Sequence, residues 1–201
     1  LAQMDRLDTT ARRVAQVAAI IGQEFEYGLL AKTAERAELS PALLQAGLET
    51  LADAGVVLLQ PGKGGHFKHA LTRDAAYGTL LPGDLQTLHG LVAETIEALS
   101  AERAPFYSLL AHHWQQAKVR PKALEYREKA GAQALSNGAY QEALAFFSEA
   151  LLLSAWAARV SRAALLEPNA SLSFRPYSPW SFSICASSSS NRVLDDEFRK
   201  P

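Results

Sequence analysis

Residues 40–68, SPALLQAGLETLADAGVVLLQPGKGGHFK, decide the fold of this chain. Ser40 is a favourable helix N-cap, and Pro41 occupies the first helical position, where its missing N–H is not needed. Leucines then recur at helical spacing until Gly55 ends the pattern. The stretch therefore begins with an amphipathic helix over about 40–54.

The second half of the stretch changes from helical to extended character. VVLL (56–59) is apolar and partly β-branched, PGKGG (61–65) is a turn, and HFK (66–68) can return as a second strand. Two short strands around a glycine-rich turn predict a β-hairpin.

Helices are predicted on both sides of this helix and hairpin. Residues 8–22, capped by Asp8, and residues 26–36 lie upstream, and residues 70–81 lie downstream. Three helices, a β-hairpin and a closing helix form the winged-helix arrangement, which we expect in residues 1–82.

The following part of the chain consists of amphipathic helical patterns, so the predicted fold is mostly α. A linker helix is expected in 83–104, and antiparallel helical hairpins in 105–154. Pro105 and Pro121 each stand where a helix is expected to begin.

Residues 124–157 resemble one tetratricopeptide repeat. Gly131 takes the small position of the first helix, and Ala143, Phe147 and Ala150 take the small-large-small positions of the second. In such repeats small residues permit close helix approach, and the aromatic ring fills the groove beside them. The resemblance implies the start of a tetratricopeptide-like solenoid that senses a protein or a ligand.

The composition favours an ordinary globular protein over one adapted to nucleic acid or membranes. The 201 residues carry a net charge of −1, and no apolar run reaches the roughly 18–20 residues that span a bilayer. The single cysteine, Cys185, fits a reducing compartment. We therefore expect a cytoplasmic protein without membrane contacts.

Residues 155–201 differ in character from the part before them. They contain ten serines and four prolines, and the helical periodicity fades. We expect a disordered or aberrant tail, such as a frameshift would produce. The chain starts at Leu1 and has Met4 as its only methionine, which adds the expectation that it is a fragment.

Several stretches together resemble bacterial STAND/AAA-type ATPases. They include AAIIGQEF (18–25), FKHALTRDAAY (67–77) and LAHHW (110–114). In that family a nucleotide-binding module precedes a winged helix and a tetratricopeptide-like sensor array, and many members are fused to a class III adenylate or guanylate cyclase domain. The resemblance implies that ATP or ADP binds an upstream module in the intact protein, and that this chain itself holds no cofactor.

His69, the first residue of HALTRDAAY (69–77), also resembles the histidine of the winged-helix Met-His-Asp motif in nucleotide switches. That resemblance implies that His69 contacts the β-phosphate of ADP in the intact protein. Lys68 and Ala70 replace the motif's other two residues. The alternative is a structural histidine that caps or packs at the start of the helix.

The chain has no residue pattern for catalysis or metal binding. No P-loop motif occurs, because Lys63 stands in a turn between two strands instead of a glycine loop that opens a helix. His66 and His69 are too few for a zinc site, which usually needs four ligands. His89 and His112 are predicted to pack and to form hydrogen bonds. We therefore expect no enzymatic activity and no metal in this chain.

Four further residues are candidates for interaction. Arg73 and Asp74 form either a solvated ion pair or a docking point for the upstream ATPase module. Trp114 and Tyr140 belong either to the helical core or to a ligand-facing groove.

Two functions remain open at this point. The first is a regulatory and protein-interaction segment that relays nucleotide state to a helical sensor array. The second is a DNA-binding transcriptional regulator with C-terminal sensor repeats. The third helix has no lysine or arginine and carries Glu49 and Asp53, whereas phosphate contacts need cations. This charge pattern favours the first function, with no nucleic acid as partner.

Overall fold

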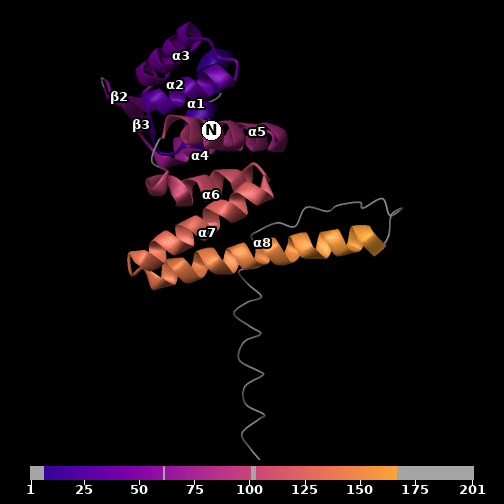
Figure 1. Cartoon of the computed structure of the whole chain (residues 1–201). Coiled ribbons are helices and arrows are strands. Elements are labelled where there is room, and N and C mark those ends of the chain that lie inside the picture. Colours follow the sequence, from indigo (N-terminus) through magenta and orange to yellow (C-terminus); the bar gives the residue numbers. More distant parts are fainter. Residues whose placement is uncertain (1–6, 61, 101–102, 167–201) are drawn as a thin grey trace, which may run out of the picture. The chain divides into compact units, whose positions relative to one another are not determined.

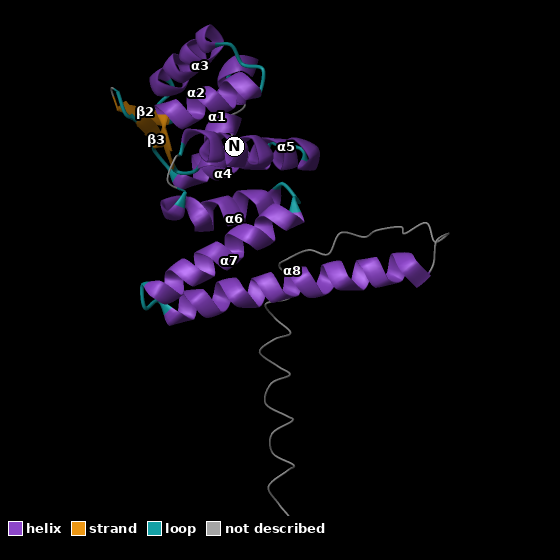
Figure 2. Ribbon diagram, viewed as in Figure 1, coloured by secondary structure: helices purple, strands orange, loops and turns teal. Residues whose placement is uncertain are grey.

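The computed structural model describes residues 7–60, 62–100 and 103–166, with side chains described as far as Ala155. The chain divides into two compact units, Leu1–Val160 and Ser161–Pro201, and the contacts described below lie within the first. The described part is mostly helical, with one small antiparallel sheet (Figures 1 and 2).

In chain order the elements are α1 (Thr9–Ile21), β1 (Glu24–Glu26), α2 (Tyr27–Arg36), α3 (Pro41–Asp53), β2 (Val57–Gln60), β3 (Gly64–Phe67), α4 (Ala70–Gly78), α5 (Pro82–Leu99), the 3-10 helix η2 (Ala104–Phe106), α6 (Tyr107–Gln116), α7 (Arg120–Ser136) and α8 (Tyr140–Leu166). The predicted helices and both strands of the hairpin are present, with ends that differ by a few residues except at the end of α8.

Helix α1 is the centre of the N-terminal module, residues 7–80. Asp8 caps it by accepting a hydrogen bond from the Ala11 N–H at 2.6 Å. The helix packs against α2, α3, α4 and α5 and buries Val14 and Val17 completely. Full burial of one such side chain stabilises the fold by about 1.5–3 kcal/mol. Gly47 lets α3 approach α1, because a Cβ there would lie 2.6 Å from Val14.

The sheet has a third strand that the sequence patterns did not predict. Its order is β1-β3-β2, with antiparallel pairing on both sides of β3. Strand β1 reads EFE and buries only Phe25, so it is too short to show a strand periodicity. Gly64 permits its pairing: φ is +143°, and a Cβ would lie 2.0 Å from the Phe25 carbonyl oxygen.

The later helices pack one on the next. Helix α5 contacts α1 and α2 on the N-terminal module and also α6, and α6 packs along α7. Gly131 of α7 makes room for Phe147 of α8, since a Cβ at Gly131 would lie 2.8 Å from the ring. Among the described helices, none has the length and apolar character needed to cross a membrane.

The expected boundary at residue 155 does not coincide with the end of a helix. Helix α8 continues to Leu166, through AWAARVSRAALL (155–166), a run rich in alanine and leucine. These residues have high helix propensity. The composition of residues 155–201 as a whole did not indicate a helix, because most of the serines lie further along the chain. The rest of the expected tail, 167–201, lies outside the described residues.

Candidate functional site

His69 stands at the N-cap position of α4 with an exposed side chain. Its imidazole makes no capping hydrogen bond, while its backbone carbonyl accepts the Thr72 N–H at 3.0 Å. His69 therefore caps the helix through its backbone, whereas its side chain neither caps the helix nor is buried. Its side chain is available to a partner outside the described chain.

Arg73 is bound within the chain. Its Nε donates to the Ala19 carbonyl oxygen at 3.3 Å, in the last turn of α1, where carbonyl groups lack helical partners. One guanidinium nitrogen also lies 3.0 Å from Asp74, and the guanidinium lies 5.7 Å from the Tyr77 ring centre. Asp74 has a side chain that is 59% exposed. Of the predicted docking pair, Asp74 faces outward and Arg73 ties α4 to α1.

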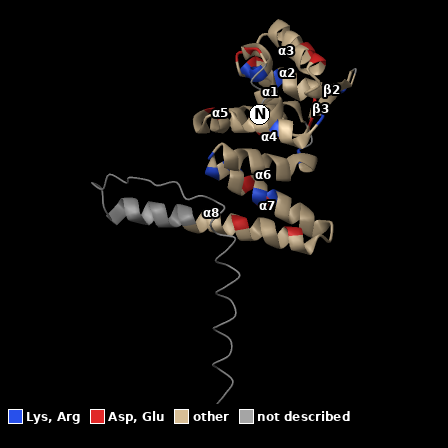
Figure 3. Cartoon of the chain, turned by 180° about the vertical axis from the view of Figure 1, so that it is seen from behind, with Lys and Arg blue, Asp and Glu red and all other residues tan. Residues whose placement is uncertain are grey.

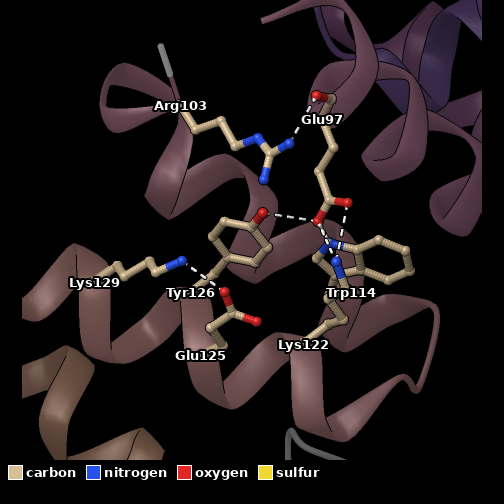
Figure 4. Close-up of polar contacts among 7 residues, drawn as sticks. All are labelled: Glu97, Arg103, Trp114, Lys122, Glu125, Tyr126 and Lys129. Carbon is tan, nitrogen blue, oxygen red and sulfur yellow. Dashed lines mark hydrogen bonds and ion pairs between the residues drawn. The ribbon is translucent and has the colours of Figure 1, made fainter. Parts of the chain in front are cut away.

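Trp114 is a core residue with a specific polar partner. It is 5% exposed, and its indole Nε1–H donates to Glu97 Oε1 at 3.0 Å. The same carboxylate oxygen accepts the Tyr126 hydroxyl at 2.8 Å and lies 2.9 Å from Lys122 Nζ. Figure 4 shows these three donors converging on Glu97 from α6 and α7. We call this group the Glu97 cluster: Glu97, Trp114, Lys122 and Tyr126.

The charge of Glu97 is stabilised by these donors. Burial acts to raise the pKa of Glu97, but hydrogen bonds from Lys122, Tyr126 and Trp114 outweigh it and hold that pKa below its usual value. Burial and the nearby Glu97 carboxylate raise the pKa of Tyr126 to about 12. The cluster therefore contains a carboxylate and a neutral phenol over the whole physiological range of pH.

Tyr140 begins α8 and is 65% exposed, so it does not belong to the core. An apolar groove of about 420 Å³ lies between α7 and α8, and its lining residues are Leu124, Glu128, Phe147, Ala150, Leu151 and Ser154. This lining includes neither Trp114 nor Tyr140. The structure therefore does not bring the two predicted interaction residues together in one groove.

A buried polar chain at the junction of three helices was only partly predicted. The Tyr77 hydroxyl lies 3.0 Å from His89 Nε2, and His89 Nδ1 lies 2.8 Å from His113 Nδ1. Both histidines are 1% exposed, whereas His112 is exposed. The predicted packing role is confirmed for His89, but on α6 the buried histidine is His113. Neighbouring residues of a helix point to different faces. Only one of His112 and His113 can therefore be buried against α5.

Burial lowers the pKa of His89 to about 4 and that of His113 to about 3, with neighbouring positive charge adding to the effect. Both rings are therefore neutral near pH 7. Their 2.8 Å separation is that of a hydrogen bond, since two nitrogens on one zinc ion lie roughly 3.3 Å apart. Among the residues that the structure describes, no group of three or more His, Cys, Asp or Glu has a geometry suited to a metal ion.

Comparison with known proteins adds no relative. No protein-family model matches the chain, and neither a curated protein nor a solved structure matches it.

Proposed function

We propose that this chain is the regulatory and protein-interaction segment of a multidomain signalling ATPase of the STAND/AAA type, of the kind often fused to a nucleotide cyclase. Residues 1–82 would act as a winged helix that reads the nucleotide state of an upstream module in the cytoplasm. Helices α6–α8 would form the first tetratricopeptide-like part of a sensor for a protein or a ligand. ATP or ADP would bind the upstream module.

One observation carries this proposal: the exposed His69 stands at the start of a helix that is tied to the rest of the chain. Along α4, Arg73 bonds the carbonyl of Ala19 on α1, and Tyr77 bonds His89 on α5. A contact between His69 and a nucleotide phosphate would therefore act on a helix connected to both the module core and the later helices. This is the arrangement that a relay requires.

The charge of α3 supports a protein-binding role over a DNA-binding one. In α3, the charged residues are Glu49 and Asp53, and the helix carries no lysine or arginine (Figure 3). A helix that enters a DNA groove needs cations near the phosphates. The lysines at the hairpin, Lys63 and Lys68, are exposed but only two.

The decisive experiment uses the longest natural protein that contains this segment. His69→Ala should speed the release of bound ADP and raise basal ATPase activity, while the matched control His66→Ala, on β3, should change neither. Unchanged ADP release in a folded His69→Ala variant would contradict the proposed role of His69.

A second experiment separates the proposal from the DNA-binding alternative. The 201-residue chain should show no gel shift with random duplex DNA at about 150 mM salt, and no calorimetric signal with ATP. Binding of DNA that weakens steeply with salt would instead support the transcriptional regulator.

A further inference from the structure

His89 is the point at which three helices are joined by side-chain hydrogen bonds. Its Nε2 bonds the Tyr77 hydroxyl of α4, and its Nδ1 bonds His113 Nδ1 of α6. His89 itself stands in the middle of α5 and is 1% exposed. Its bond to His113 is buried, and its bond to Tyr77 is partly buried. The docking of α6 on α5 therefore includes a direct bond between two imidazoles.

The bond requires that the pair stay neutral. When His89 donates its Nδ1–H to His113 Nδ1, its Nε2 accepts the Tyr77 O–H, and every atom of His89 is satisfied. In the opposite tautomer His113 donates to His89, and His89 Nε2–H donates to the Tyr77 oxygen. In both cases His113 Nε2 is left as a buried atom without a partner among the described residues.

Protonation of both rings destroys this arrangement. Each Nδ1 would then carry a hydrogen, and two donors would face each other at 2.8 Å without an acceptor. Even one added proton places a positive charge in a site where burial disfavours it.

The surrounding charges do not compensate such a proton. The groups whose charge reaches the pair are Arg73 on α4 and His112 on α6, and Arg127 on α7 acts on His112 in turn. All three are positive or become positive in acid. None of the three carboxylates of α5 bonds the pair: Glu94 pairs with Arg36, Glu97 belongs to its own cluster, and Asp84 is exposed in the first turn of the helix.

We propose that Tyr77, His89 and His113 form an acid-sensitive latch, which holds α6 on α5 while both imidazoles are neutral and releases it when they take up protons. This histidine latch does not depend on the nucleotide-reading role proposed for the intact protein. It would uncouple the later helices from the N-terminal module when the pH around the chain falls.

The direction and window of the effect follow from the two protonation states. In the docked state the pKa values are about 4 and about 3, whereas an exposed histidine titrates near 6.5. The released state therefore binds more protons below about pH 6.5, and docking is lost as the pH falls from 6.5 toward 4. The docking equilibrium constant should fall by up to about tenfold per pH unit for each histidine, or up to about a hundredfold for both.

Hydrogen exchange on the complete 201-residue chain tests the latch. Protection of α6 (107–116) is measured at pH 7.5 and pH 5.5, corrected for the intrinsic pH dependence of exchange, with α3 (41–53) as internal reference. We expect α6 protection to fall about ten- to a hundredfold more than α3 protection. Equal loss in both helices would mean global unfolding and would overturn the proposal, as would no loss in α6.

Two substitutions on neighbouring positions provide the matched control. His113→Asn keeps a polar group near the position of Nδ1 but cannot titrate, so the acid response of α6 should shrink to at most about tenfold per pH unit, the share that His89 alone contributes. His112→Asn removes an exposed histidine outside the bond, whose charge only adds to the effect, and should keep the larger part of the wild-type response. A wild-type acid response in a folded His113→Asn variant would overturn the latch.

A second measurement uses only the wild-type chain. It therefore tests the latch even where the His113→Asn variant does not fold. Proton NMR titration of the wild-type chain should show that the His89 and His113 imidazoles do not shift until α6 is released. If His89 and His113 titrate near 6.5 with α6 still protected, the proposal is wrong.

Discussion

Replacing Glu97 by alanine should destabilise the chain, because it leaves several buried donors without their acceptor. The substitution removes the shared acceptor of Trp114 and Tyr126, which are 5% and 1% exposed, and of the less buried Lys122. An unsatisfied buried donor costs about 1–3 kcal/mol, whereas a half-exposed lysine loses about 0–1 kcal/mol.

The free energy of unfolding should fall by about 2–5 kcal/mol in total. The loss is at the lower end of this range if water enters where the partly exposed carboxylate was. Glu97 has a side chain that is 16% exposed, so some access exists. For a domain of this size, the melting temperature should fall by roughly 5–15 °C. Because folding lowers the pKa of Glu97, its contribution is present above the pKa of an unfolded glutamate and is lost as the pH falls through the folded value.

The assay is urea unfolding followed by circular dichroism at pH 7, with two further variants that test the cause. Glu97→Gln keeps an acceptor oxygen for the indole and the phenol and should cost only about 1–2 kcal/mol. Tyr126→Phe should cost about 1 kcal/mol alone but almost nothing in the Glu97→Ala background, since it then removes an orphaned hydroxyl. A Glu97→Ala cost below about 0.5 kcal/mol, or strictly additive costs in this cycle, would refute the shared-acceptor argument.

Three further predictions concern packing and charge, and each is measured by the same unfolding experiment. Gly64→Ala should cost more than about 2 kcal/mol, because its Cβ would overlap the Phe25 carbonyl. Gly83→Ala, in open space on α5, should be neutral or slightly stabilising. Equal effects of the two substitutions would contradict the role of Gly64 in β1 pairing. Gly131→Ala should cost about 1–3 kcal/mol through the Phe147 ring, and Phe147→Leu in the same chain should recover part of it; no recovery would place the strain elsewhere. Arg127 is 6% exposed and bonds Gln115 and Glu149. Arg127→Ala should therefore cost about 2 kcal/mol or more, while Glu149→Gln, at a carboxylate that is 53% exposed, should cost less than about 1 kcal/mol. The reverse order would show that the ion pair matters more than the burial of the arginine.

The sequence predicted the elements that have a period or a cap of their own. Asp8 and Ser40 start α1 and α3 where the capping rule placed them, and both side chains accept the expected backbone N–H. Strand β1 could not be predicted, because it depends on the absence of a side chain at Gly64, about forty positions further along the chain. A local pattern assigned that glycine to a turn, although it also pairs with another strand.

The candidate site was less predictable because its chemistry depends on which face each helix buries. Helical spacing alone left Trp114 and Tyr140 equivalent, yet the first is buried against Glu97 and the second is 65% exposed. Tyr77, His89 and His113 come from three helices, and no spacing within one element links them. Such a contact can be identified only when the arrangement of the three helices is known.

The placement of α5 fits the relay proposed above, because this helix packs against helices on both sides of it. Residues 83–104 were expected to link two parts, but α5 packs on α1 and α2 and also on α6, and buries Val92 and Ile96. Apolar packing holds helices together but tolerates rearrangement, whereas a buried hydrogen bond has one allowed geometry. Helix α5 carries two such groups toward later helices, His89 and Glu97, which are eight positions apart and therefore on nearby sides of the helix. Two fixed points determine an orientation where one would permit rotation. Loss of one of them therefore removes the fixed orientation of α6 on α5, and a change of orientation is what the proposed relay between the two parts would need.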